Sequence, residues 1–287
     1  MSRRPCLLFD PEALVDNYRY LDQLGGGETG AVVKANAYGL GVDWVVPTLV
    51  EAGCSTFFVA YPDEGAMVRR LAPDATIYVF HGVSAETLPQ CHASRLRPCV
   101  NTAEGLNLVA HQGLEPALHL DTGMHRLGLE PSHVTVADLE SCAPSLIMSH
   151  MVSSDQPQSP DNPSQLAALI AWCAEHAPGV PRSLANTGGL LLGAHYHLEL
   201  SRPGIGLYGG SPDPALHWPS RSVVCWRAPI LQLQIVRKGE SVGYGSTWIA
   251  DRDRVIATSA SGYADGLLRS LGNAWVGRFG SIHCPLV

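Results

Sequence analysis

The segment Ala31-Val32-Val33-Lys34-Ala35-Asn36-Ala37-Tyr38-Gly39 places a lysine directly after three apolar residues that predict a buried strand. Only two of the 19 basic residues are lysines, Lys34 and Lys238. Lys238 lies in a polar turn that contains glycine, where its amine would be solvated. Partial desolvation at the end of a buried strand favours the neutral, nucleophilic amine that forms Schiff bases with carbonyl cofactors. The alternative is a Lys34 side chain that simply extends from the strand end into water.

The composition is that of an ordinary globular protein. Hydrophobic residues make up 46% and charged residues 16% of the 287, enough for one large domain or two. The net charge of −7 argues against non-specific binding of nucleic acid, and no apolar run is long enough to cross a membrane. The start of the chain does not have the pattern of a signal peptide, and the eight scattered cysteines predict reduced thiols in the cytoplasm. We expect no metal, with a zinc site among the twelve histidines as the minor alternative.

Short apolar runs alternate with helical periodicity over the first two-thirds of the chain. The helical stretches are Val46–Gly53, Asp63–Leu71, Glu104–His111 and Pro163–His176. The predicted strands are Ala31–Lys34, Thr56–Ala60, Thr76–Phe80, Arg97–Val100, Ala117–Leu120, Leu146–Ser149, Ser183–Asn186 and Leu200–Arg202. Eight alternating strand–helix units favour a closed (β/α)8 barrel, the TIM-type fold, over an open doubly wound sheet. We place this barrel at residues 7–215.

Each predicted strand ends at or just before a polar or ionisable side chain. These residues are Lys34, Tyr61, His81, Asn101, Asp121, His150, Asn186 and Arg202. Barrels of this type carry their active site at the carboxyl ends of the strands, so the pattern predicts a site there. The alternative explanation is that strand ends are generally more polar than strand middles.

A second, all-β domain is predicted over residues 220–287. Trp226–Val236 alternates between apolar and polar residues with the period of a half-buried strand. Val255–Ser259 and Trp275–Phe279 are predicted as further short strands with turns between them. The sequence stops inside another predicted strand that begins near Ile282, so we expect the domain to be incomplete.

Six segments resemble the alanine racemases and follow one another in the order found in that family. They are Ala31–Gly39, Asp121–Gly128, Ser183–Thr187, Ser201–Gly209, Gly243–Trp248 and Ser261–Gly266. The resemblance runs from about Leu7 to Val287. It implies a pyridoxal 5'-phosphate-dependent barrel enzyme that works as a head-to-tail homodimer. Such an isomerase would interconvert L- and D-alanine in the cytoplasm and supply D-alanine for peptidoglycan of the cell wall.

The resemblance implies two catalytic bases on opposite faces of the substrate. Lys34 would hold the cofactor and act on one face, and Tyr244 of the partner subunit would act on the other. His150 and Arg202 would help Tyr244 to act as a base, and Arg202 would also face the pyridine nitrogen of the cofactor. Because an arginine hardly gives up its proton, the ring nitrogen would stay unprotonated and the carbanion would be short-lived. The alternative for Arg202 is a surface or salt-bridged arginine.

The family pattern also implies the remaining contacts. The other cofactor-binding residues would be Tyr38, Asn186, Thr187, Gly204 and Ile205, most of them around the phosphate. Gly204 would let the backbone approach the anion closely. Arg126 would bind the substrate carboxylate, which suits the planar fork of a guanidinium group.

The sequence departs from the family at three points. His119 stands where the family often has a lysine, which is carbamylated in some members and steadies the arginine that corresponds to Arg126. His119 or a bound anion would have to steady Arg126 here. Leu40 replaces the usual histidine without a clear consequence. The family continues beyond the point that matches Val287, where a further phosphate-binding tyrosine and a methionine near the substrate would lie. A related racemase that acts on serine or larger side chains, and a cofactor-binding chain without turnover, are the alternative functions.

Overall fold

The structure is a computed structural model, and it describes residues 4–213 and 218–287. The chain forms two compact units. One is Phe9–Val223, and the other joins the residues before Phe9 to Val224–Val287. The predicted domain boundaries are residues 7, 215 and 220, of which residue 215 lies outside the described part of the chain. The strand β1 (Cys6–Phe9) pairs with β11 (Val224–Arg227) where the chain passes between the units.

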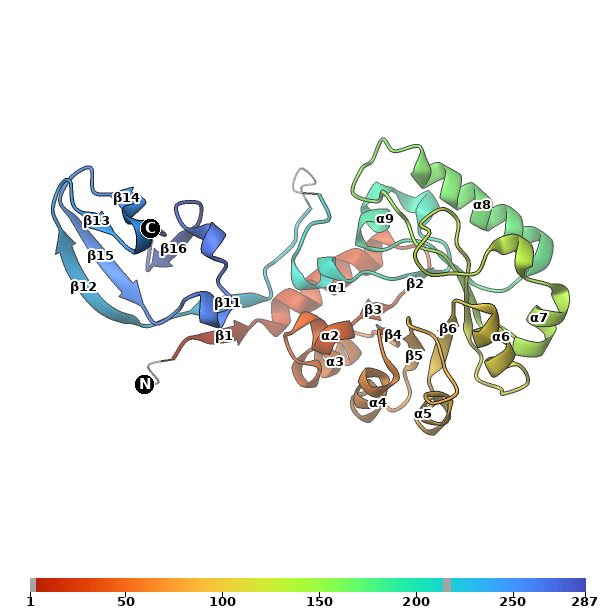
Figure 1. Ribbon diagram of the computed structural model, residues 1–287. Coiled ribbons are helices and arrows are strands. Elements are labelled where there is room, and N and C mark those ends of the chain that lie inside the picture. The colour runs from red at the N-terminus through yellow and green to blue at the C-terminus, as the bar shows by residue number, and fades with distance from the viewer. Residues whose placement is uncertain (1–3, 214–217) are drawn as a thin grey trace. The chain divides into compact units, whose positions relative to one another are not determined.

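The first unit is built on a parallel sheet in which the strands follow one another in chain order (Figure 1). Its seven strands are β3 (Ala31–Val32), β4 (Thr56–Val59), β5 (Thr76–Val79), β6 (Arg97–Val100), β7 (Ala117–His119), β8 (Leu146–Met148) and β9 (Arg182–Ser183). Each overlaps a predicted strand, and the predicted and observed ends differ by at most three residues. This order, with a crossover between each pair of strands, is that of a (β/α)8 barrel.

Two short strands close the barrel. The strand β10 (Leu200–Ser201) pairs in parallel with β2 (Glu28–Thr29), which continues through Gly30 into β3. On its other side, the N–H of Arg202 donates to the carbonyl of Ala185, just beyond β9, at 2.8 Å. Glycine suits position 30 because a Cβ there would lie 2.8 Å from the ring of Phe58. The predicted eight-stranded barrel is therefore confirmed.

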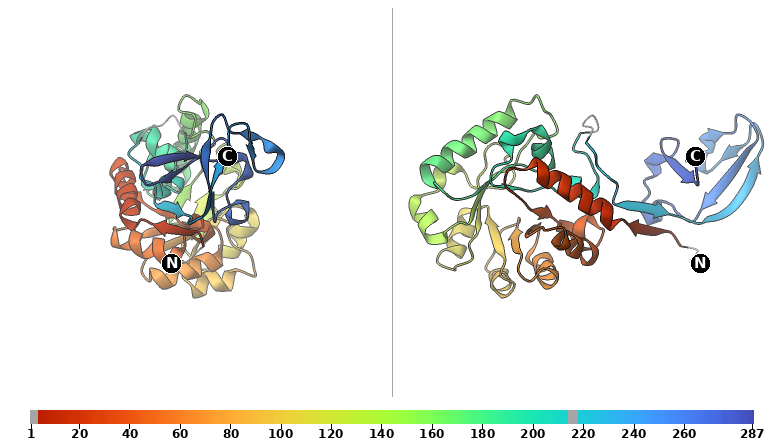
Figure 2. Two further views of the ribbon diagram at one scale, coloured as in Figure 1. Left: turned by 90° about the vertical axis from the view of Figure 1, so that its left-hand side faces the viewer. Right: turned by 180° about the vertical axis from the view of Figure 1, so that it is seen from behind.

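Helices cover the outside of the strands (Figures 1 and 2). They are α1 (Pro11–Leu24), α3 (Val42–Glu51), α4 (Pro62–Leu71), α5 (Leu88–Ala93), α6 (Ala103–Val109), α7 (Val136–Cys142), α8 (Asp161–His176) and α9 (Thr187–Leu192). In α1, the Asp10 carboxylate caps the N–H of Ala13, and Leu14, Tyr18 and Leu21 form the buried stripe. None of the helices in the described ranges is long and apolar enough to span a bilayer.

The interior of the barrel is filled by side chains from nearly every strand. The cluster contains Val32, Phe58, Tyr78, Cys99, Ala117, Leu146, Met148 and Leu200. Phe58 stacks on Tyr78 and on Phe80 with ring centroids 5.1 and 5.3 Å apart. The interior is therefore a packed core.

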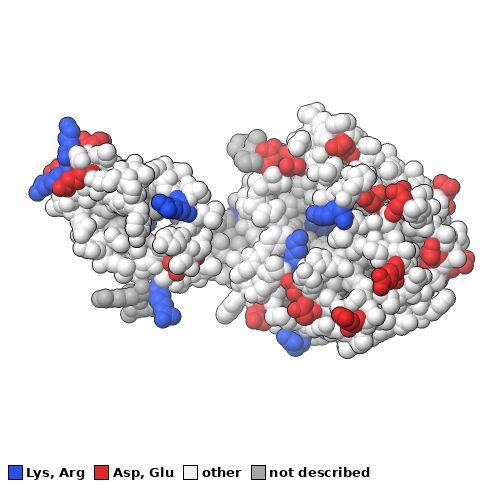
Figure 3. Space-filling model, in the orientation of Figure 1, with Lys and Arg blue, Asp and Glu red and all other residues white. Residues whose placement is uncertain are grey.

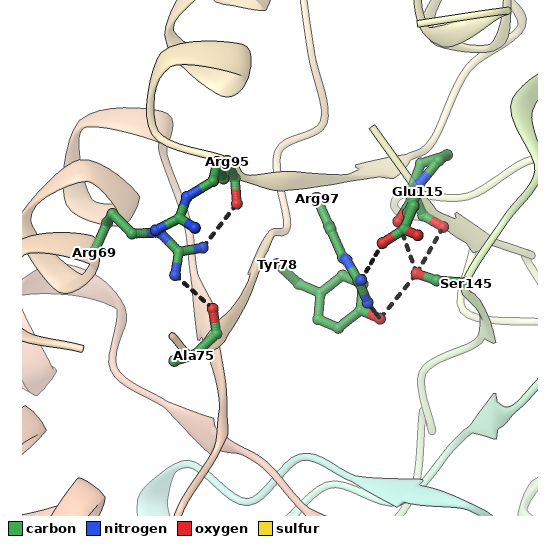
Figure 4. Close-up of polar contacts among 8 residues, drawn as sticks. Arg69, Ala75, Tyr78, Arg95, Arg97, Glu115 and Ser145 are labelled. Atoms are coloured by element: carbon green, nitrogen blue, oxygen red, sulfur yellow. Dashed lines mark hydrogen bonds and ion pairs between the residues drawn. The ribbon is translucent and has the colours of Figure 1, made fainter. Parts of the chain in front are cut away.

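The amino-terminal rim of the barrel is tied together by arginines (Figure 4). Arg69 donates to the carbonyls of Ala75 at 2.7 Å and Arg95 at 2.8 Å, which belong to two different loops. Nearby, Arg97 pairs with Glu115, and the hydroxyls of Tyr78 and Ser145 lie 3.0 Å apart. These contacts join the segments that lead into β5, β6, β7 and β8, and that end of a barrel generally serves stability.

The second unit is composed of β-hairpins and short 3-10 turns. Its paired strands are β12 (Ile230–Val236) with β15 (Arg254–Ser259), β13 (Ser241–Val242) with β14 (Trp248–Ile249), and β16 (Val276–Phe279) with β17 (Ile282–Pro285). The predicted strand Trp226–Val236 is broken at Pro229, which has no N–H for a ladder. The prediction that it is half-buried was wrong, because Leu233 and Ile235 are 62% and 65% exposed.

Candidate active site

A cavity of about 280 Å³ opens at the carboxyl end of the barrel strands. Its wall contains Lys34, Ala60, Phe80, His81, His119, Arg126, Leu127, Met148 and His150. Three of the eight predicted strand-end residues, Lys34, His81 and His150, lie in this wall. Tyr61 packs edge-on against His81 with ring centroids 4.3 Å apart. The polar strand ends therefore do converge on a cavity, although not all of them reach it directly.

Lys34 begins a left-handed turn rather than ending a strand. The strand β3 stops at Val32, and the turn α2 (Lys34–Tyr38) has φ angles of 52–56° from Ala35 to Tyr38. Such angles cost about 1–2 kcal/mol per L-residue, so neighbouring contacts must hold the turn. The Lys34 side chain is exposed at the cavity. Lys34 is thus more exposed than its place after an apolar run predicted, because the turn carries it out of the strand.

Contacts at both ends stabilise this turn. At its start, the N–H of Ala35 donates to the Glu64 carboxylate at 2.6 Å. Further on, the side chain of Asn36 accepts from the N–H of Val42 at 2.9 Å. The ring of Tyr38 packs on Tyr208 with centroids 4.8 Å apart. The segment that carries Lys34 is thus fixed by groups from three other parts of the barrel unit.

Arg202 is buried beside the cavity and contacts His150. Its Nη2 donates to the carbonyl of Ser149 at 2.6 Å and lies 3.4 Å from Nδ1 of His150, and Nη1 donates to the hydroxyl of Ser183. An arginine can only donate, so Nδ1 of His150 accepts and the imidazole keeps its proton on Nε2. Burial and the Arg202 charge lower the pKa of His150 to about 3. The surface-arginine alternative for Arg202 is wrong, since this side chain is 2% exposed.

His119 is held in one tautomer by Asn101. The amide nitrogen of Asn101 donates to the carbonyls of Phe80 and Cys99 at 2.8 and 2.9 Å. Its oxygen must therefore accept from Nδ1–H of His119, at 2.7 Å. Burial first, and then the charges of Arg202 and Arg126, lower the pKa of His119 to about 4. His119 is consequently neutral at pH 7 and has an unprotonated Nε2.

Asp121 shapes the loop that carries Arg126. Its Oδ1 accepts from the backbone N–H groups of Gly123, Met124 and His125 at 2.9, 2.9 and 3.1 Å. Arg126 follows directly, and its side chain is exposed at the cavity wall. Figure 3 shows basic side chains near the middle of the visible face of the barrel unit and carboxylates around its periphery. The cations of the cavity, Lys34 and Arg126, thus suit an anionic ligand.

The segments after β9 and β10 are joined by hydrogen bonds to backbone N–H groups. The Thr187 hydroxyl oxygen accepts from the N–H groups of Gly204 and Gly206, both at 3.1 Å. A Cβ on Gly204 would lie 2.4 Å from the hydroxyl of Tyr38, so any larger residue there would displace the Tyr38 side chain. Ile205 begins the 3-10 turn η3 (Ile205–Tyr208) next to these residues. The structure therefore brings together Tyr38, Thr187, Gly204 and Ile205 at the place where such barrels bind phosphate.

The other predicted site residues have different surroundings. The Asn186 side chain caps α9 by accepting from the N–H of Gly189 at 2.9 Å. Tyr244 lies in the second unit, in the 3-10 turn η4 (Tyr244–Ser246), and its side chain is 82% exposed. Sequence reasoning missed Glu64, Ser149 and Ser183. Only Glu64 had a signal, an acidic side chain in the first turn of a predicted helix.

Comparison with known proteins gives one consistent match. The family models of the alanine racemase N-terminal and C-terminal domains match residues 9–212 and 223–287. The alanine racemases of Jannaschia sp. (strain CCS1) and Cereibacter sphaeroides are 42% and 44% identical to this chain, over 98% of it and 81% of their own length. The crystal structure of the Bartonella henselae alanine racemase with covalently bound pyridoxal phosphate superposes with a TM-score of 0.87 at 32% identity. That match covers 99% of this chain and 82% of the other.

Proposed function

This chain belongs to the alanine racemase family, and we propose which of its residues bind the cofactor and which move protons as it interconverts L- and D-alanine. It is a pyridoxal 5'-phosphate-dependent isomerase. The observation that carries the residue roles is the cavity in which Lys34, His119, Arg126 and His150 meet. Arg202 lies beside them in contact with His150.

The residues around the cavity fit pyridoxal 5'-phosphate. Lys34 provides the amine that would carry the cofactor. The Thr187 hydroxyl oxygen already accepts hydrogen bonds from two N–H groups, so its hydrogen can be donated to a phosphate oxygen. The Tyr38 hydroxyl and the amide N–H of Ile205 would be further donors to the phosphate. Asn186 would act through Thr187, because it caps the helix that Thr187 begins. When bound, the cofactor supplies the electron-withdrawing group that acidifies the α-hydrogen of an amino acid.

Two bases on opposite faces of the substrate would invert its α-carbon. Lys34 would accept or return the α-proton on the face of the barrel cavity. Tyr244 would do the same on the opposite face, with its hydroxyl as the proton-carrying group. The exposure of Tyr244 and its place in the second unit support delivery by a partner subunit in a head-to-tail homodimer. Each active site would then contain residues of both chains.

The neighbouring residues would orient the substrate and fix the protonation of the site. Arg126 would bind the substrate carboxylate with its guanidinium fork. His119 would present the lone pair of Nε2 toward the cavity and steady Arg126 without carrying a charge of its own. Arg202 would donate to the ring nitrogen of the cofactor, since burial lowers its pKa only to about 10 and leaves it protonated at pH 7. His150 would link Arg202 to the second base.

We also propose the cytoplasm as the place of this reaction and peptidoglycan synthesis as the use of its D-alanine. All eight cysteines lie in the described part of the chain and are free thiols, including the exposed Cys6, Cys225 and Cys284. Exposed free thiols are typical of a reducing compartment. The product is a D-amino acid, which ribosomal synthesis does not use.

The proposed roles are tested by following the loss of deuterium from α-deuterated L-alanine in water. We expect the wild type and Lys238→Ala to release deuterium at similar rates, because Lys238 lies outside the cavity wall. We expect Lys34→Ala to show no measurable release. Equal rates for Lys34→Ala and Lys238→Ala would overturn the assignment, and a wild type that absorbs visible light without releasing deuterium would indicate binding without turnover.

A further inference from the structure

The carboxylate of Glu64 connects two walls of the cavity. Its Oε1 accepts from the N–H of Ala35, the residue next to Lys34, at 2.6 Å. Its Oε2 accepts from the N–H groups of Ala60 and Tyr61 at 2.7 and 3.2 Å. Both Lys34 and Ala60 line the cavity, and Glu64 stands in the first turn of α4, 29 residues beyond Ala35.

Capping of α4 accounts for only part of this arrangement. An acidic residue at the third helical position often accepts from the N–H groups that precede its helix, as Oε2 does here. The bond from Oε1 leaves the helix and reaches the loop after a different strand. A charged acceptor makes a stronger bond than a neutral one, so Glu64 binds the Ala35 N–H firmly.

The bond to Ala35 acts on Lys34 through the peptide group that the two residues share. The direction of the Ala35 N–H is set by the ψ angle of Lys34, so a fixed N–H fixes that angle. The turn that follows is conformationally costly, with left-handed angles from Ala35 to Tyr38. Its far end is held by Asn36 and Tyr38, and its near end by Glu64.

We propose that Glu64 is a positioning residue for Lys34, which locks the Lys34–Ala35 peptide and thereby aims the amine into the cavity. The inference rests on the proposed role of Lys34 as the cofactor-binding base. Glu64 itself does not line the cavity. It acts on the geometry of proton transfer and leaves the substrate carboxylate site at Arg126 unchanged.

The variant Glu64→Gln separates positioning from capping. A glutamine has one acceptor oxygen, and since Oε2 accepts two bonds and Oε1 one, we expect that oxygen to stay at the α4 end. The Ala35 N–H would then face an NH2 group. Asp63→Asn is the matched control, because it removes the same charge from the same helical turn at an exposed neighbour.

We measure hydrogen exchange of residues 35–39, with and without cofactor, together with steady-state kinetics. In Glu64→Gln we expect exchange of this segment to be about tenfold faster than in Asp63→Asn, from the loss of one charge-assisted bond. We expect kcat to fall about ten- to a hundredfold while KM for alanine changes less than about twofold. Exchange and kcat equal to those of Asp63→Asn would mean that Glu64 only caps α4.

A second variant decides the matter if Glu64→Gln does not fold. Glu64→Asp keeps the charge at the start of α4 but shortens the side chain by one methylene, so its carboxylate cannot span both loops. We expect the same faster exchange at residues 35–39 and the same fall in kcat, whereas wild-type values for both would overturn the proposal. Failure of the Lys34 role would be recognised separately, as cofactor trapped on another residue of the wild type.

Discussion

His119 and His150 are histidines that the fold keeps uncharged at pH values where a free imidazole is protonated. Burial is the main cause, and it lowers their pKa values to about 4 and about 3. In an unfolded chain both would titrate near about 6.5. Between that pH and the folded values the unfolded state binds more protons than the folded state. Stability should therefore fall as the pH drops below about 6.5, by up to about 1.4 kcal/mol per pH unit for each histidine.

This dependence is measured by urea unfolding at several pH values between 7 and 4.5. We expect His119→Gln to reduce the slope of unfolding free energy against pH, because one of the two proton-binding differences is removed. The control is His133→Gln, an exposed histidine at the end of a 3-10 turn, which should keep the wild-type slope. Identical slopes in the two variants would contradict a neutral, buried His119.

For single residues, the sequence indicated which side chains belong to the candidate site better than it indicated the contacts that those side chains make. Lys34, His150 and Arg126 were singled out by motif, and they do share one cavity. The tautomer of His119 could not be predicted, because it depends on Asn101 from a neighbouring strand and on two backbone carbonyls. The exposure of Lys34 was missed for a similar reason. The catalytic role of Lys34 and the roles of the other site residues stay predictions.

Among the elements, the loops at the amino-terminal rim depend on Arg69. Its guanidinium donates to carbonyls of Pro73, Ala75, Ser94 and Arg95 at distances between 2.7 and 3.0 Å. We expect Arg69→Met to lower the free energy of unfolding by about 2–3 kcal/mol, because several carbonyls lose their donor. Racemase activity at moderate temperature should be unchanged, since the active site lies at the opposite rim.

Arg70→Met is the control for this prediction, as Arg70 is the exposed neighbour in the same turn of α4. Chemical denaturation and turnover are measured on both variants. If Arg69→Met kept wild-type stability but lost turnover, the contacts of Arg69 would serve catalysis rather than stability.

The strands of the barrel were predictable to within three residues because each is a short apolar run bounded by loop residues. The left-handed turn after Lys34 was not, since Ala35, Ala37 and Tyr38 rarely adopt such angles and only Asn36 favours them. The turn exists because Glu64, Tyr208 and the following loop hold it. Pro229 was visible in the sequence, but the apolar alternation around it favoured one continuous strand.

For the whole molecule, the proposed dimer predicts complementation between inactive chains. Lys34→Ala chains lack the first base and Tyr244→Phe chains lack the second. In a mixed dimer, one of the two sites would contain an intact Lys34 and a Tyr244 from the partner. We therefore expect up to about a quarter of wild-type activity after subunit exchange at equal concentrations, because half of the dimers would be mixed with one good site each.

The control for this experiment is a mixture of two differently tagged Lys34→Ala chains, which must exchange subunits without gaining activity. Tag exchange between Lys34→Ala and Tyr244→Phe chains is followed in parallel. Complete exchange with no return of activity would show that Tyr244 serves its own subunit or is not the second base.

The most direct test of the account is borohydride reduction of the protein with its cofactor, followed by peptide mapping. Reduction makes the bond between cofactor and lysine permanent, so the modified residue can be identified by mass. With only two lysines in the chain, the alternatives are few. We expect the cofactor to be found on Lys34, with loss of the visible absorbance band, and Lys238 to be unmodified. Cofactor trapped on Lys238, or on no lysine, would contradict it.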